Sequence, residues 1–291
     1  MRTKHQFLAE PVHTPGPDAP FAVLPVPFER TVSFGRGTAK APAAILDASV
    51  QAELFDDEFF RPLEFKVQTL PAIDCRGATE AVFGRIRRRA ESVLRAGRFL
   101  MSFGGEHSIT VPLVAAAKAV HSDICVLNLD SHLDMRDSFR GSRFSHACVF
   151  RRVMELNVPV AHAGIRSLCL EEYDLCRKRK VRVFWARRIL AEKNDRWMDA
   201  LLKRLKKKVY ISIDIDCLDV ALMPGTGTPE PGGLAWQTVL KLLRRIAAER
   251  KVVGADIVEV IPMPGAPACE YVAAKLAIKL MTYLSRKFQY E

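Results

Sequence analysis

Residues 130–134 place three potential metal ligands at every second position, directly after an apolar run. The run, residues 124–129, is short, apolar and preceded by a polar break, which predicts a buried strand. Alternate side chains of an extended backbone share one face, so Asp130, His132 and Asp134 are expected to converge on one point. The pattern therefore predicts a ligand cluster at the end of a strand.

Two further apolar runs lead into side chains of the same kind. Residues 209–213 lead into Asp214 and Asp216, and residues 98–103 lead into His107. Open α/β sheets build their sites at the carboxyl ends of their strands. We therefore expect the three segments to meet at one edge of a sheet.

A pair of glycines stands between the third run and its histidine. Gly104 and Gly105 are compatible with a plain turn. The functional interpretation is that they adopt positive φ, which glycine does without steric penalty, and so let His107 turn back toward the other ligands.

The charge of this ligand set requires cations. Four carboxylates gathered in a protein interior are strongly unfavourable, because each unpaired buried charge costs several kcal/mol. Two divalent ions would cancel the four charges and leave neutral His107 and His132 as additional ligands. An oxygen-rich set with some imidazole suits manganese or magnesium better than zinc, and no cysteine stands at ligand spacing.

Composition places the chain among ordinary globular proteins. No segment approaches the roughly 18 uninterrupted apolar residues of a membrane span, and residues 1–10 lack the apolar core of a signal peptide. Seven cysteines are scattered without a CxxC pair, which favours reduced thiols. A cytoplasmic protein without a membrane partner is expected.

The net charge of +11 comes largely from basic runs at residues 85–89, 177–180 and 203–208. The first and third fall in segments with helical periodicity, where apolar side chains mark an inward face. No aromatic residues interleave with the cations, as a platform for nucleic-acid bases would require. We interpret the runs as solvated faces and expect no nucleic-acid partner.

Strand-like runs alternate with helix-like runs along the chain. Strands are expected at residues 21–25, 99–103, 124–129, 159–164, 181–185, 209–213 and 252–258. Helices are expected at residues 42–49, 80–96, 108–120, 146–156, 197–207, 236–249 and 269–286. This alternation predicts an α/β fold, one domain over residues 1–291 with a mainly parallel sheet covered on both faces.

Four segments together resemble the ureohydrolase family, which includes arginases and agmatinases. They are residues 104–108, 130–134, 145–146 and 212–233, and the proline- and glycine-rich part at 224–233 is the most specific. The resemblance covers roughly residues 31–284. It implies a three-layer α/β/α sandwich with a mainly parallel eight-stranded sheet, and hydrolysis of a guanidino group to urea and an amine with two manganese ions per subunit.

The resemblance also assigns roles to residues. The family's six metal-ligand positions fall here on His107, Asp130, His132, Asp134, Asp214 and Asp216. Paired ions lower the pKa of a shared water, which supplies hydroxide for attack on the guanidinium carbon. By resemblance, Asp134 hydrogen-bonds this hydroxide and passes its proton on. Glu106 stands where aspartate is frequent in the family, and the loop 224–233 is expected to form a pocket wall.

Two further residues are expected to serve the substrate. His146 matches the family's shuttle histidine, and imidazole titrates near neutral pH, as a proton shuttle requires. Glu259, at the end of the run 252–258, matches the glutamate that orients the guanidinium through paired hydrogen bonds. Taken alone, each has an ordinary alternative: a structural histidine, or a solvent-facing glutamate.

Residues 164–167 and 145–147 resemble agmatinases more than arginases, and Met135 and Arg136 stand where arginases carry an asparagine-bearing loop. Agmatine, cleaved to putrescine and urea, is therefore the first expectation. Arginine and guanidinobutyrate stay open, because a protein of charge +11 is a poor attractor for a dication. A non-catalytic basic binding protein is a further alternative, signalled by lost ligands, but all six are present. The family habit implies a homo-oligomer, a trimer or hexamer.

Overall fold

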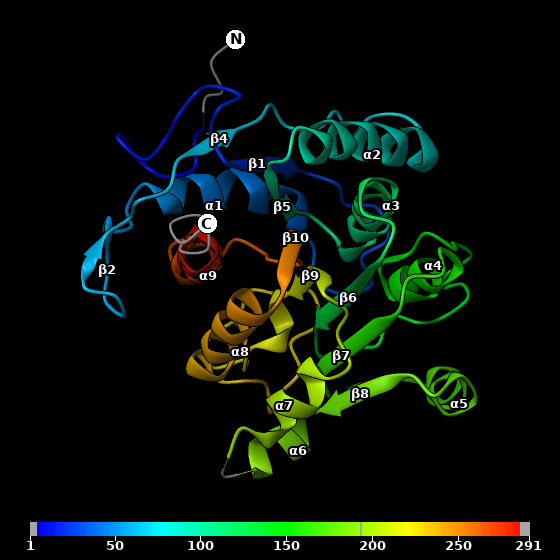
Figure 1. The fold of residues 1–291 in the computed structure, drawn as a ribbon. Helices are drawn as coiled ribbons and strands as arrows, with labels where there is room; N and C mark the ends of the chain where they lie inside the picture. The colour runs from blue at the N-terminus through cyan, green and yellow to red at the C-terminus, as the bar shows by residue number, and fades with distance from the viewer. Residues whose placement is uncertain (1–4, 193, 286–291) are drawn as a thin grey trace.

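One eight-stranded sheet forms the centre of the computed structural model, which describes residues 5–192 and 194–285 (Figure 1). The strand order is β4-β1-β5-β10-β9-β6-β7-β8, and every pairing is parallel. The strands are β1 (Phe21–Val26), β4 (Val67–Thr69), β5 (Phe99–Gly104), β6 (Ile124–Leu129), β7 (Val160–Ile165), β8 (Arg182–Trp185), β9 (Lys208–Asp214) and β10 (Lys251–Val258). The predicted eight-stranded parallel sheet is confirmed.

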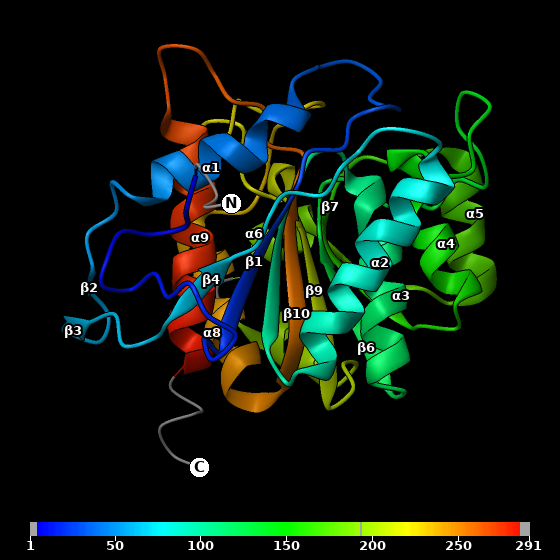
Figure 2. The ribbon, with the colours of Figure 1, turned by 90° about the horizontal axis from the view of Figure 1, so that it is seen from above.

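Helices cover both faces of the sheet, which gives three layers (Figures 1 and 2). One face carries α1 (Ala41–Ser49), α6 (Ala186–Ala191), α7 (Arg196–Leu202), α8 (Trp236–Glu249) and α9 (Ala268–Ser285). The other carries α2 (Thr79–Arg95), α3 (Thr110–Val120), α4 (Val149–Glu155) and α5 (Leu170–Arg179). The α/β/α sandwich expected from the sequence is therefore confirmed.

Each layer of helices encloses its own hydrophobic core. In β6, Cys125, Leu127 and Leu129 belong to one core. Ile124 and Val126 belong to the core on the opposite face. Because both faces of this strand are buried, it reads in the sequence as a continuous apolar run.

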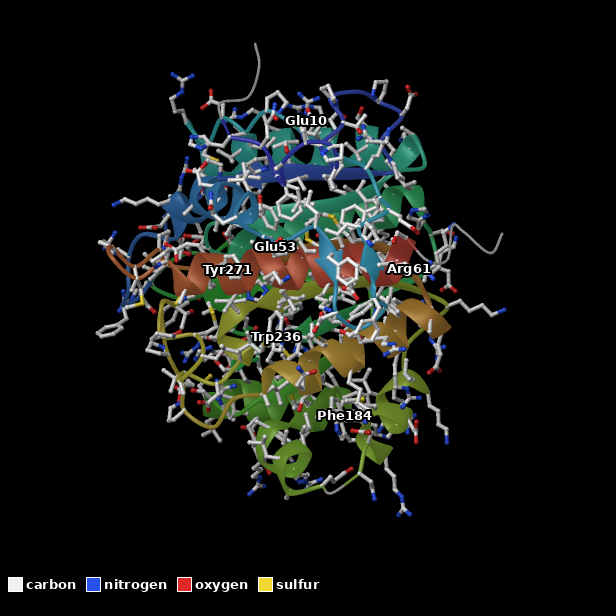
Figure 3. All side chains as sticks on the ribbon, turned by 90° about the vertical axis from the view of Figure 1, so that its left-hand side faces the viewer. Glu10, Glu53, Arg61, Phe184, Trp236 and Tyr271 are labelled. Atoms are coloured by element: carbon white, nitrogen blue, oxygen red, sulfur yellow. The ribbon has the colours of Figure 1, made fainter. Side chains whose placement is uncertain are left out.

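A two-stranded hairpin, β2 (Phe55–Asp56) with β3 (Arg61–Pro62), lies outside the main sheet. Lys279 of α9 is buried and places its Nζ 3.0 Å from Asp56 Oδ2 and 2.5 Å from Asp57 Oδ1. Figure 3 shows α8 and α9 lying across this face of the molecule, with Arg61 of the hairpin beside them. Strands of two residues carry no readable period, so the hairpin was not predicted.

Several boundaries differ from the sequence predictions. The helix predicted at 197–207 ends at Leu202, and Arg204 N and Leu205 N donate to carbonyls only three residues back, which marks tight turns. The helices predicted at 108–120 and 146–156 begin as 3-10 turns at residues 107–109 and 146–148. The short elements β4, α5 and α6 were not predicted. Arg286, in the last predicted helix, lies outside the described residues.

The solvated-face interpretation of the first basic run holds. In α2, Ile86 is fully buried while Arg87, Arg88 and Arg89 are exposed. The third run was wrongly expected to be helical: α7 ends at Leu202, residues 203–207 form the turn that leads into β9, and Lys208 is the first residue of that strand. Within the described residues, no helix combines the length and hydropathy needed to cross a membrane. All seven cysteines are free thiols.

The expectation of positive φ at Gly104 and Gly105 was wrong, because neither glycine is in that conformation. Glycine is required there for space. A Cβ on Gly105 would lie 2.0 Å from the Phe28 carbonyl oxygen, and one on Gly104 would lie 2.6 Å from Val258 Cγ1. The β5 end therefore approaches the loop after β1 at backbone contact distance, and Glu106 N donates to Phe28 O at 2.8 Å.

We expect Gly105→Ala to destabilise the protein by at least about 1–3 kcal/mol, because the new methyl group meets backbone that cannot turn aside. Unfolding in guanidinium chloride, followed by circular dichroism, measures the loss of stability. Gly16→Ala is the matched control, since a Cβ on Gly16 meets nothing within 4 Å. Equal unfolding midpoints for the two variants would contradict the packing argument.

Candidate active site

The predicted site residues follow four strands that are neighbours in the sheet, β5, β10, β9 and β6. His107 follows β5, Glu259 follows β10, Asp214 ends β9, and Asp130 follows β6. The strands are parallel, so their carboxyl ends lie at one edge. The topology brings together segments that are 152 residues apart in the chain, since His107 N donates to Glu259 Oε1 at 2.6 Å.

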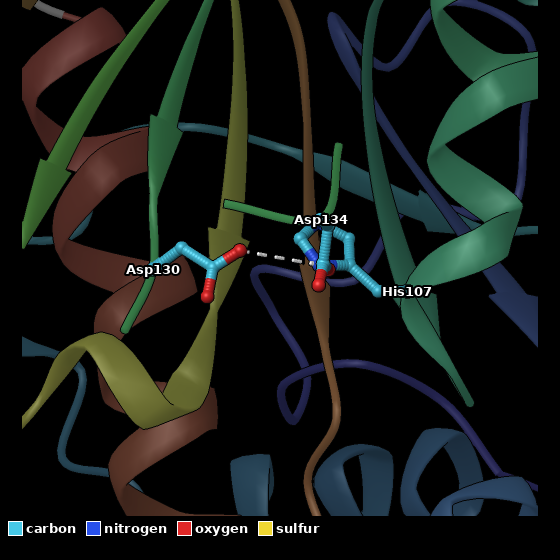
Figure 4. Close-up of side chains that lie close together, drawn as sticks. All are labelled: His107, Asp130 and Asp134. Atoms are coloured by element: carbon cyan, nitrogen blue, oxygen red, sulfur yellow. Dashed lines mark ion pairs between the residues drawn. The ribbon is translucent and has the colours of Figure 1, made fainter. Parts of the chain in front are cut away.

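His107 stands at the centre of a first group of carboxylates. Its Nδ1 lies 3.1 Å from Asp134 Oδ2, 3.3 Å from Asp214 Oδ2 and 3.5 Å from Asp130 Oδ2. Figure 4 shows the imidazole ring of His107 close to the carboxylates of Asp130 and Asp134. His107, Asp130 and Asp134 offer ligand atoms close enough together to hold one metal ion.

Asp130 also belongs to a second group. Its partners there are His132 and Asp216, and His132 Nδ1 lies 3.0 Å from Asp216 Oδ2. This group is also compact enough for one metal ion. Asp130 therefore lies between two candidate cation positions, as a bridging carboxylate would.

The expectation that Asp130, His132 and Asp134 converge on one point was wrong in its geometry. Strand β6 ends at Leu129, and Asp134 has a left-handed φ of 49°. The segment therefore leaves the extended conformation, and His132 and Asp134 fall into different groups.

A hydrogen-bonded chain behind His107 sets its tautomer. Ser212 Oγ donates to Asp256 Oδ1 at 2.7 Å, so it accepts from His107 Nε2 at 3.0 Å. The Nδ1 lone pair of His107 is then directed to the carboxylates and is available to a metal ion. Sequence reasoning missed Ser212 and Asp256, although their positions on β9 and β10 are in register.

Without cations this cluster is electrostatically unfavourable. Burial and the neighbouring carboxylates raise the pKa of Asp130 well above its usual value, and burial and Asp216 raise that of Asp214 to about 7. Burial alone would lower the pKa of His107, but Asp134 and Asp214 outweigh it and raise that pKa well above the usual value. The buried Nδ1 of His107 makes no hydrogen bond. A divalent ion would satisfy this orphaned nitrogen and neutralise the carboxylates, so the donor set fits metal ions.

A cavity of about 240 Å³ opens beside the two groups. Five predicted functional residues from four segments line it: His132, Asp134, His146, Asp214 and Glu259. Gly227 and Thr228 also line it, which confirms that the loop 224–233 forms a pocket wall.

Glu259 is buried and strained, which contradicts the ordinary picture of a solvent-facing glutamate. Its φ is 62°, a conformation that only a few per cent of residues other than glycine adopt. Burial, Asp214 and Glu106 raise its pKa well above the usual value. One carboxylate oxygen accepts from His107 N, and the side chain lines the cavity, so a cation bound there would meet an ionisable carboxylate.

His146 opens a 3-10 turn and lines the same cavity. Burial lowers the pKa of its imidazole below the usual value, against the opposing effect of Asp134 and Glu106. The ring is therefore neutral near pH 7 and able to accept a proton.

Arg166 clamps the pocket wall, a role that sequence reasoning missed. Its guanidinium donates to the backbone carbonyls of Asp216 and Glu230, each at 2.7 Å, and to that of Pro231 at 3.1 Å. Asp219 adds a second anchor, because its carboxylate accepts from the backbone amides of Gly232 and Gly233. The loop 224–233 is thus fastened directly to the segment that carries the second ligand pair.

Comparison with known proteins agrees with this geometry. The chain is 39% identical over 287 residues to the N(1)-aminopropylagmatine ureohydrolase of Synechocystis sp., covering 96% of this chain and 93% of that protein. It is 36% identical over 250 residues to the agmatinase of Pyrococcus horikoshii, covering 84% of each. The crystal structure of the agmatine ureohydrolase of Thermoplasma volcanium matches with a TM-score of 0.86 and 31% identity, over 94% of this chain and 93% of that one.

A model of the arginase family matches residues 19–283, nearly the whole described chain. The matched region includes all six candidate ligands, His146 and Glu259. The chain therefore belongs to the arginase family of ureohydrolases.

Proposed function

We propose that the protein is a binuclear manganese ureohydrolase that cleaves agmatine to putrescine and urea. The observation that carries this proposal is the gathering of six candidate metal-ligand side chains into two groups beside a cavity that Glu259 and His146 also line. A binding protein without catalysis would not need this complete set.

Four residues, His107, Asp130, Asp134 and Asp214, would hold one Mn²⁺, and Asp130, His132 and Asp216 would hold the other. When bound, the ions supply a water of lowered pKa and stabilise the charge that develops on attack at the guanidinium carbon. The preference for manganese follows from a donor set of carboxylate oxygens with some imidazole nitrogen.

Glu259 orients the substrate in this proposal. A buried carboxylate of raised pKa gains most from a cationic partner, and a guanidinium offers two parallel N–H donors. Holding the plane of the guanidinium presents its carbon to the metal groups. Gly227 lies opposite: a Cβ there would be 3.4 Å from Glu259 Oε2, so glycine keeps the carboxylate accessible.

His146 and Asp134 handle the protons. The amine leaves poorly unless it is protonated, and His146 is a neutral imidazole on the cavity wall that can take up a proton and release it. Asp134 lies on the same wall, and in this proposal it receives the proton of the attacking water and passes it on.

The local charge favours a cationic substrate despite the net charge of +11. The four positive charges of two Mn²⁺ ions would balance the four negative charges of Asp130, Asp134, Asp214 and Asp216. The other charged residues that line the cavity are Glu172, Glu259 and Arg136. They sum to one negative charge, which supports agmatine over a substrate with a carboxylate tail.

A second candidate substrate is N(1)-aminopropylagmatine. The relatives from Synechocystis and from Thermus thermophilus, each 39% identical, are named for its hydrolysis. This compound carries the same guanidinium with an extended cationic tail and no carboxylate, so the same charge argument supports it.

We expect the purified protein with Mn²⁺ to release urea from agmatine or N(1)-aminopropylagmatine at a kcat/KM at least about 100-fold above that for arginine or guanidinobutyrate, since a buried unpaired carboxylate is penalised strongly. A urea assay across the four compounds, with the amine products identified by mass spectrometry, measures this. Absence of urea from all four would refute the proposed reaction, and preference for guanidinobutyrate would refute the charge argument.

The shared position of Asp130 generates a metal prediction. Asp130→Asn should weaken binding of both ions, because its carboxylate belongs to both groups, whereas Asp216→Asn should weaken only one. Elemental analysis and titration of free Mn²⁺ by electron paramagnetic resonance measure the stoichiometry. If Asp130→Asn retained both ions at wild-type affinity, the bridging assignment would be incorrect.

Glu259→Gln should lower kcat/KM by about 100-fold, because the amide keeps the shape but loses the charge that pairs with the guanidinium. Steady-state kinetics on the preferred substrate measure the effect, and elemental analysis confirms that manganese is retained. Unchanged kinetics would remove Glu259 from the substrate site.

Two further expectations accompany the proposal. The chain is expected to form one domain over residues 1–291 and to assemble as a trimer or hexamer. Light scattering coupled to size-exclusion chromatography determines the assembly.

A further inference from the structure

Thr31 connects a buried carboxylate to the histidine on the cavity wall. Thr31 lies in the loop after β1, Glu106 lies after β5, and His146 opens a 3-10 turn, so three distant segments meet. Thr31 Oγ1 is 2.8 Å from Glu106 Oε1 and 3.2 Å from His146 Nδ1.

Glu106 is fully buried and surrounded by donors. It accepts from Arg30 N at 2.5 Å, Thr31 N at 2.6 Å, Thr31 Oγ1 at 2.8 Å and Ser108 Oγ at 2.6 Å. In all four hydrogen bonds Glu106 is the acceptor, so each of these groups directs its proton to the carboxylate. The hydroxyl proton of Thr31 therefore points to Glu106.

The direction of this hydrogen bond decides the tautomer of His146. With its only proton committed to Glu106, Thr31 Oγ1 can only accept from other groups. It accepts from His146 N at 2.9 Å, and it faces the ring nitrogen Nδ1 at 3.2 Å. Nδ1 must then carry the proton of the neutral ring, which leaves the lone pair on Nε2.

Ser145 is the competing partner of Nδ1. Its Oγ lies 3.4 Å from Nδ1 and already accepts from Ala147 N at 3.3 Å. If the Ser145 hydroxyl donated to Nδ1, Nδ1 would carry a lone pair. That lone pair would face a lone pair of Thr31 Oγ1, which lies closer to Nδ1 than Ser145 Oγ does. The Thr31 contact therefore determines the tautomer. Phe139 packs edge-to-face against the imidazole, with 5.9 Å between the ring centroids.

We infer that Thr31, anchored by Glu106, is a positioning residue that holds His146 with Nδ1 protonated and Nε2 free to exchange protons in the cavity. This inference rests on the proposed function, in which His146 is the proton shuttle. It adds to that function a chain of hydrogen bonds with fixed donor direction, Glu106–Thr31–His146, that determines which ring nitrogen of His146 exchanges protons.

The test is a pair of substitutions at Thr31 in the manganese-loaded protein. Thr31→Val keeps the shape but removes the acceptor, and should lower kcat about 10- to 100-fold with KM and manganese content unchanged. The loss of kcat cannot exceed that of His146→Ala, which is expected to be on the order of 10²–10⁴-fold for a general acid–base group. Thr31→Ser restores the hydroxyl and should recover most of the lost kcat.

A double-mutant cycle shows whether Thr31 acts through His146. In the His146→Ala background, Thr31→Val should cause no further loss of kcat, because the group that it positions is absent. A loss of equal size in both backgrounds would overturn the inference. Thr79→Val is the matched control. The Thr79 hydroxyl accepts from the side chain of Arg30, the residue before Thr31, at 3.1 Å, and Thr79 does not line the cavity, so kcat should equal wild type.

Glu106→Gln gives an independent arm if Thr31→Val is unstable. The amide can donate to Thr31, which frees the hydroxyl to donate to Nδ1 and favours the unproductive tautomer, so kcat should fall while KM and manganese content hold. Wild-type kcat in both Thr31→Val and Glu106→Gln would refute the inference while leaving urea release intact. Absence of urea release from the wild-type protein would instead refute the proposed function.

Discussion

Electrostatic repulsion among four buried aspartates is the constraint on which the rest of the structure depends. The parallel sheet delivers Asp130, Asp134, Asp214 and Asp216 to one edge, and burial removes the water that would otherwise solvate their charge. Burial, and then repulsion from the neighbouring carboxylates, raise the pKa values of Asp130 and Asp214. Divalent cations bound in place of the protons would relieve this repulsion. The hydrogen bonds from His107 to Ser212 and from Ser212 to Asp256 already leave the Nδ1 lone pair of His107 available to such an ion.

The site is held by strained backbone as well as by charge. Asp134 and Glu259 both have positive φ, at 49° and 62°. Such conformations are unfavourable for residues other than glycine and persist where the surrounding structure imposes them. Here the surroundings are specific: Phe150 N donates to the Asp134 carbonyl, and Glu259 N donates to the Gly105 carbonyl. Both residues carry carboxylates that line the cavity, so the strain lies where side-chain direction shapes the candidate site.

Much of this arrangement could be predicted from the sequence, because its signals are local. Apolar runs buried on both faces identify the strands, and polar residues directly after them identify the candidate ligands. Three of the features that were not predicted show the physical reasons why. The split of His132 and Asp134 between two groups depends on a left-handed residue that no local pattern reveals. The packing role of Gly105 depends on Phe28, which is distant in the chain. Arg166 donates to backbone carbonyls, which every residue has, so the residue types of its partners do not reveal these hydrogen bonds.

Anomalous diffraction at the manganese edge, from crystals of the full chain grown with Mn²⁺, tests the central claim most directly. The account predicts two peaks per chain, one among His107, Asp130, Asp134 and Asp214, and the other among Asp130, His132 and Asp216. A single peak, or two peaks that do not share Asp130, would contradict it.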